Sequence, residues 1–170
     1  LAFIVLDSTF NEASTHYFNE QVCDIFAEYI IETSDGEIKI SRPLVDKIYK
    51  YTGDNVVVDK KLEYPFNKLD LSTLVWRNVG SYLNAIRGSK DKFCFISYCE
   101  TDNYEYYKFY RGPMNANVFF NKKSKKYRSG YFIDNYECLN NVGDLLGTTY
   151  KNFFVSTINP GANDYLFNNK

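Results

Sequence analysis

The sequence predicts an α+β fold in which N-terminal helices pack on a C-terminal antiparallel β-meander or partial barrel. Two observations lead to this prediction. In the first half, apolar residues recur at steps of three and four positions, which is the spacing of a helix face. In the second half, short runs rich in aromatic and β-branched residues are separated by turn residues, as in antiparallel strands. The 170 residues fit a single domain, because the sequence contains no linker or repeat.

The first half is expected to contain three helices and two short strands. Ser8 or Thr9 can cap the first helix, Pro43 suits the first turn of the second, and Asp70 can cap the third. Gly88 would end the third helix. The helices are expected at about 8–31, 41–52 and 70–88, and the strands at 37–40 and 55–59.

The second half is expected to consist of strands and a tail. Turn residues at 101–103, 111–113, 122–126 and 140–143 separate its apolar runs. Residues 159–170 would form a loose tail after Pro160 and Gly161. The strands are expected at 93–98, 104–110, 117–120, 131–133 and 153–157.

The apolar run from Leu1 to Leu6 has two interpretations. It can be a first strand, or it can be the remnant of a membrane anchor or signal. Six residues cannot span a bilayer, which takes about 20. The sequence leaves both interpretations open.

Four cysteines could form disulfides: Cys23, Cys94, Cys99 and Cys138. No pair has a zinc or redox spacing, and the lone His16 cannot complete a zinc site, so we expect no metal. Cys94 and Cys99 are five positions apart, which in an uninterrupted strand puts them on opposite faces. They would then bridge elsewhere, for example one of them to Cys138. The alternative is that the cysteines are buried free thiols.

Composition restricts the partners. Aromatic residues make up 18% of the chain, with 16 Tyr and 14 Phe, so large rings are available both for a core and for a binding surface. The net charge of −1 gives no overall field that would attract nucleic acid or anionic lipid. We therefore expect no nucleic-acid partner, and membrane contact only through an N-terminal anchor.

The candidate ligand site is the tyrosine-rich segment 104–110. Strand alternation places Tyr104, Tyr106 and Tyr110 on one face, together with Lys108. Tyrosine has an apolar ring and a polar tip, which suits an amphipathic small molecule or another protein subunit. The alternative is that these tyrosines only fill the core.

Two charged groups give weaker signals. The basic run 122–128 could touch phosphate, but a solvated hairpin tip is the simpler interpretation. Paired carboxylates can serve a hydrolase. The acidic grouping in the strand-rich half consists of Glu100, Asp102 and Glu105, with Asp134 and Glu137.

In its layout the chain resembles small periplasmic sensor domains. This resemblance and the residues above lead us to expect a non-enzymatic, extracytoplasmic domain, without a cofactor, that binds a ligand or partner in bacterial sensing or signal transduction. Such a domain could act with a membrane-bound regulator. An alternative is a structural or interaction module such as a pilin-like subunit, an adhesin or an immunity protein. A hydrolase that uses the acidic group is a more remote alternative.

Overall fold

The protein, seen in a computed structural model, is mostly β, and the predicted N-terminal helices are wrong. The structure describes residues 2–6, 8–18, 29–33, 35–63, 67–74, 78–112, 114–130, 142–150 and 153–158. Over these ranges it contains one helix, α1 (Val79–Gly88). The strands are β1 (Ala2–Leu6), β2 (Glu12–Tyr17), β3 (Tyr29–Glu32), β4 (Ile38–Ser41), β5 (Lys47–Tyr51), β6 (Val56–Lys61), β7 (Phe93–Glu100), β8 (Tyr104–Arg111), β9 (Met114–Asn121), β10 (Lys126–Gly130), β11 (Val142–Tyr150) and β12 (Phe153–Ile158).

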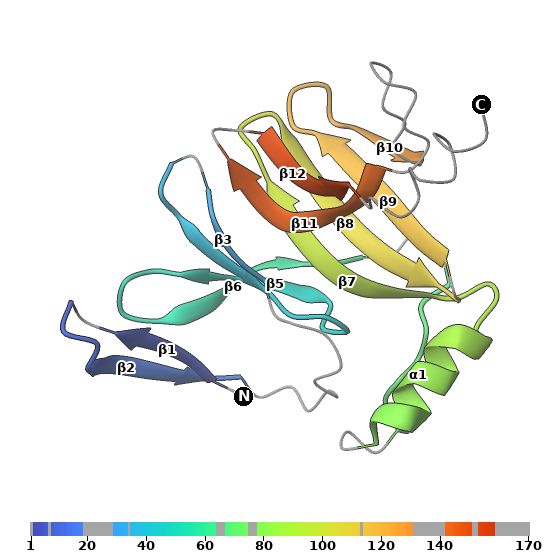
Figure 1. The fold of residues 1–170 in the computed structure, drawn as a ribbon, viewed down its shortest axis with the longest axis horizontal. Coiled ribbons are helices and arrows are strands. Elements are labelled where there is room, and N and C mark those ends of the chain that lie inside the picture. The colour runs from blue at the N-terminus through green and yellow to red at the C-terminus, as the bar shows by residue number, and fades with distance from the viewer. Residues whose placement is uncertain are drawn as a thin grey trace, which may run out of the picture.

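The strands form two four-stranded antiparallel sheets and two antiparallel hairpins (Figure 1). One sheet has the order β3-β4-β5-β6 and the other the order β10-β9-β8-β7, while β1 pairs with β2 and β11 with β12. Strand β7 joins the two sheets: the N–H of Leu44 donates to the carbonyl of Phe95 at 2.8 Å, and the N–H of Tyr98 donates to Ser41 Oγ at 3.3 Å. The β11–β12 hairpin lies across β7 and β8 (Figure 1).

The predicted helix 8–31 is replaced by strands at both ends. Strand β2 pairs with β1, and Phe10 lies in the hairpin turn between them with a φ of 63°. Strand β3 alternates as a strand does, since Ile30 is exposed and Ile31 is buried. Where the structure describes them, the residues at three- and four-residue spacing therefore belong to separate elements. Residues 19–28 lie outside the described part of the chain.

The predicted helix 41–52 is also wrong. Leu44 has a φ of 67°, which a right-handed helix cannot contain, and its N–H bonds to strand β7. Leu44 and Ile48 are both buried, as a helix face would be. However, Leu44 lies in a turn and Ile48 lies in β5, so their four-residue spacing does not reflect a helix. The flanking strands at 37–40 and 55–59 are confirmed as β4 and β6.

The third helix is confirmed at its end and wrong at its start. Asp70 caps only a short turn, by accepting from the N–H of Ser72 at 2.9 Å. The true N-cap is Asn78, whose Oδ1 accepts from the N–H of Ser81 at 3.0 Å. The helix ends at Gly88, as predicted. Its buried Tyr82 and Ile86 pack in one cluster with Cys94 and Ile96 of β7.

The predicted strands of the second half are confirmed at β7, β8, β9 and β12. The sequence did not predict β10 and β11, which occupy segments we had assigned in part to turns. The turn at 111–113 is confirmed in Gly112, whose φ of 58° suits glycine. The predicted strand 131–133 and the tail 159–170 lie outside the described residues.

Of the two interpretations of the N-terminal run, the structure has the strand, since Ala2–Leu6 forms β1. Residues Phe3 and Val5 are partly buried on one face, and Ile4 and Leu6 are exposed on the other. Among the described residues, no helix is long and apolar enough to cross a membrane.

Candidate functional site

The three predicted ligand-binding tyrosines share a face of β8 but do not form one site. Tyr106 is fully buried, and its hydroxyl donates to Asn117 Oδ1 at 2.8 Å. Tyr110 is half-buried and packs against the cluster under α1. Tyr104 keeps 42% of its surface exposed. Tyr104 is therefore the predicted residue that remains available to a ligand.

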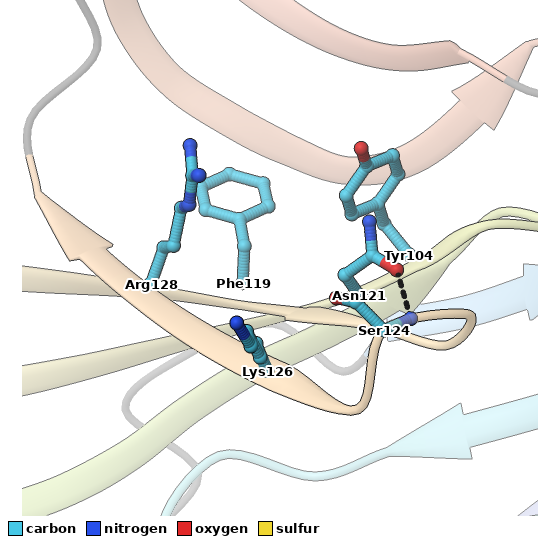
Figure 2. Close-up of a pocket in the computed structure, with 6 residues that line it drawn as sticks. All are labelled: Tyr104, Phe119, Asn121, Ser124, Lys126 and Arg128. Carbon is cyan, nitrogen blue, oxygen red and sulfur yellow. Dashed lines mark hydrogen bonds between the residues drawn. The ribbon is translucent and has the colours of Figure 1, made fainter.

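Tyr104 lines a pocket of about 170 Å³ on the β8–β9–β10 part of the sheet (Figure 2). The register of β8, β9 and β10 brings its lining residues together. Tyr104, Asn121 and Lys126 form one row across the three strands, and Tyr106, Phe119 and Arg128 form the next. The pocket is lined by Tyr104, Phe119, Asn121, Ser124, Lys126 and Arg128.

The apolar part of the pocket is anchored to the core. The Phe119 ring lies 5.1 Å from the ring of Tyr106 and 5.7 Å from that of Phe154 in β12. In Figure 2, Tyr104, Phe119 and Arg128 point to the side of the sheet over which the β11–β12 hairpin passes. Phe119 thus belongs both to the core and to the pocket, which holds its ring in place.

The β9–β10 turn fixes the polar side of the pocket. Asn121 Oδ1 accepts from the N–H of Lys123 at 3.0 Å and from that of Ser124 at 2.8 Å. Lys125 adopts a φ of 56°, and its N–H donates to the Asn121 carbonyl at 2.8 Å. With its oxygen held in the turn, the Asn121 amide nitrogen faces the pocket (Figure 2).

Lys126 and Arg128 give the pocket its charge. Both side chains are exposed, and neither forms an ion pair with another residue in the described part of the chain. Sequence reasoning had treated 122–128 as a solvated hairpin tip and missed these two residues and Phe119. The signal that could have found them is the alternation in Lys126-Tyr127-Arg128, which places the two cations on one face of a strand.

Two residues of the acidic group considered for a hydrolase, Glu100 and Glu105, are paired with lysines. Glu100 accepts from Lys39 at 2.9 Å and lies 3.4 Å from Lys122 Nζ, and Glu105 pairs with Lys60. No group of three potential metal ligands occurs among the described residues. Asp102 is exposed in the β7–β8 turn, whereas Asp134 and Glu137 lie outside the described ranges.

Tyrosine hydroxyls complete this buried network. Tyr98 donates to Glu100 and Tyr107 donates to Glu105. Burial, reinforced by the neighbouring carboxylates, raises the pKa of both phenols, so they stay protonated donors. Lys60 also donates to the Tyr98 hydroxyl at 3.3 Å.

Both charges of the central pair are stabilised. Burial works against ionisation of Glu100, but hydrogen bonds from Tyr98 and Lys39 outweigh it and lower the pKa of this carboxyl. Burial likewise opposes the charge of Lys39, but Glu100 and Asp59 raise its pKa. The pair therefore stays ionised over the neutral range, and we assign it a structural role in joining β4 to β7.

The predicted disulfides are not found among the described cysteines. Cys94 and Cys99 are buried free thiols, so the predicted bridge from one of them to Cys138 is wrong. Burial raises the pKa of each to about 12. A β-bulge between Phe95 and Ser97 puts both cysteines on one face of β7. In the pairing with β8, Cys94 lies next to Tyr110 and Cys99 lies next to Tyr106. Cys23 and Cys138 lie outside the described residues.

Comparison with known proteins gives one similar fold. No family model and no curated protein matches the sequence. A crystal structure of a "putative exported protein" from Bacteroides fragilis is similar, with a TM-score of 0.72 and 12% identity over 98% of this chain. The chain spans 49% of that protein, about half its length. At this identity the likeness shows the fold alone, so the conclusion is that this chain has the fold found in part of that protein.

Proposed function

We propose that this chain is a non-enzymatic, extracytoplasmic domain that binds a small amphipathic ligand in bacterial sensing or signal transduction. The observation that carries the proposal is the pocket beside Tyr104, in which aromatic side chains lie next to cations that have no carboxylate partner among the described residues. A lining that combines aromatic side chains with a few polar groups is a feature of small-molecule sites.

Support for an extracytoplasmic location comes from the exported protein of similar fold. The free thiols Cys94 and Cys99 add no such support. The resemblance to periplasmic sensor domains was one of layout, and the predicted layout with N-terminal helices is wrong, so the resemblance adds no support either.

A ligand screen tests the binding role. Thermal unfolding would be followed with bile salts, fatty acids, amino acids and sugars, because a ligand that binds only the native state raises Tm. At least one class should do so, and Tyr104→Ala should abolish its effect. Tyr127→Ala is the matched control, since Tyr127 is exposed on the neighbouring β10 but does not line the pocket. If no class raises Tm, the ligand-binding role is wrong.

Fusions of the complete gene product test the location. An alkaline phosphatase fusion should be active, because that enzyme needs an oxidising compartment, and a β-galactosidase fusion should be inactive. The reverse pattern would place the domain in the cytoplasm and contradict this part of the proposal.

The β1–β2 hairpin favours a second candidate function, an interaction module. Ile4, Leu6, Phe10 and Tyr17 are all at least half exposed, with Phe10 at 84%. Exposed apolar side chains on one hairpin are a feature of protein-binding surfaces. This function predicts concentration-dependent association that Ile4→Ser with Phe10→Ser removes, which light scattering would measure; a monomer at all concentrations would exclude self-association.

A further inference from the structure

We propose that the pocket beside Tyr104 binds a single six-membered ring that carries a carboxylate, such as an acidic monosaccharide or an aromatic acid. This inference rests on the proposed function, because it names the ligand class of the same pocket. Three properties of the pocket lead to it: its size, its aromatic side chains and its uncompensated positive charge.

The size of the pocket limits the ligand to one ring. Its volume is about 170 Å³. For comparison, an engineered apolar cavity of about 150 Å³ accommodates benzene. A larger amphipathic molecule, such as a bile salt or fatty acid, could place only part of its surface here.

The aromatic side chains explain why that part should be a ring. Tyr104 and Phe119 come from neighbouring strands, one row apart in the register, and both point to the same side of the sheet (Figure 2). The Phe119 ring is held by Tyr106 and Phe154, so little side-chain freedom is lost when a ligand packs against it. The flat faces of sugars and of aromatic rings both suit such a surface.

The charge explains why the ring should carry a carboxylate. Lys126 and Arg128 are two positions apart on β10, so their side chains leave the same face about 7 Å apart. Figure 2 shows Phe119 beside Arg128, and Tyr104 beside Asn121. Arginine can donate two parallel hydrogen bonds to a carboxylate, lysine adds a third donor, and the Asn121 amide adds a neutral one.

The contrast with neighbouring lysines supports this role. Lys122, in the same turn, lies 3.4 Å from Glu100, and Lys125 lies 5.7 Å from the centre of the Phe120 ring. Lys126 and Arg128 have no such intramolecular contact among the described residues. A ligand carboxylate would supply the missing partner.

Isothermal titration calorimetry with matched compounds tests the inference. The probes are glucuronate against glucose, and benzoate against benzyl alcohol, so that each pair differs mainly in charge. We expect each carboxylate to bind at least about ten-fold more tightly than its neutral partner, as hydrogen bonds to charged groups would give. The pair with the higher affinity identifies a sugar or an aromatic acid as the ligand source.

Variants assign the effect to the pocket. Lys126→Gln combined with Arg128→Gln should lower carboxylate affinity at least about ten-fold, and should lower neutral-ring affinity by a smaller factor. Lys123→Gln is the matched control: it removes a positive charge from the adjoining β9–β10 turn but does not line this pocket, and should change the affinity less than about two-fold. Circular dichroism and Tm would verify that all variants fold.

The outcomes separate this inference from the proposed function. Equal binding of neutral and charged probes, or no effect of the double variant, would overturn the carboxylate assignment while Tyr104-dependent binding still supports a binding domain. If no ring compound of either charge binds, both the ring assignment and the ligand-binding role at this pocket are wrong.

Discussion

The buried network around Glu100 and the open pocket around Tyr104 use the same residue types on opposite faces of one strand. Glu105 and Tyr104 are adjacent in β8, so their side chains point to opposite faces of the sheet. In the network, Lys39 and Lys60 are neutralised by buried carboxylates. In the pocket, the cations meet no carboxylate among the described residues. Lysine and tyrosine thus stabilise the fold where acids face them and remain available to a ligand where none does.

The comparison predicts its largest effect at Glu100. Glu100→Gln keeps the shape of the side chain but leaves the buried Lys39 with Asp59, at 3.1 Å, as its remaining close carboxylate, which should destabilise the protein by about 1.5–3 kcal/mol. Urea unfolding measures this change, with the exposed Glu32→Gln as the control. A loss equal to that of the control would show that the network does not stabilise the fold.

The same network predicts a pH dependence. The folded-state pKa of Glu100 is lowered below its ordinary value of 4.5, so its stabilisation is complete above pH 4.5 and is lost as pH falls through the lower folded-state pKa. Unfolding free energy measured from pH 7 to pH 3 should therefore decline. Glu100→Gln should reduce that decline, and an unchanged slope would assign it to other carboxyls.

A smaller effect separates two of the predicted ligand-binding tyrosines. Tyr106→Phe removes the donor to Asn117 Oδ1 and leaves this buried oxygen unpaired, at a cost of about 1–2 kcal/mol. Tyr104→Phe should cost less than about 0.5 kcal/mol, because its side chain is exposed. Equal losses in urea unfolding would contradict the division between core and pocket.

The smallest effect is expected in the pocket. Lys126→Gln and Arg128→Gln should each change the free energy of unfolding by less than about 0.5 kcal/mol, since neither removes an ion pair formed within the described chain. Differential scanning calorimetry would measure Tm. A clear destabilisation would mean that these cations support the fold.

The sequence predicted the strands that are determined by local alternation. Segments 93–98 and 104–110 combine high strand propensity with turn residues on either side, and both were confirmed. The helix end at Gly88 was also correct. The N-terminal helices failed because burial at three- and four-residue steps arises equally when a turn and a strand bury one residue each, as Leu44 and Ile48 do.

The candidate site was predicted in part. Tyr104 was identified from alternation alone, because period-two spacing determines the face of each residue in a strand. Tyr106 and Tyr110 were placed on the same face correctly, but alternation does not reveal which residues another element covers. Phe119 packs with Phe154 of β12, a contact between residues 35 positions apart in the sequence.

By itself, the sequence determined that the second half forms aromatic antiparallel strands and which side chains share a face, because these properties depend on neighbours along the chain. Only the tertiary structure decided which tyrosine stays exposed, which lysines meet carboxylates and where the two cysteines point. These depend on strand register, on one β-bulge and on contacts such as Lys39 with Glu100 between separate strands. The physical reason is that burial and charge pairing are set by packing between distant segments.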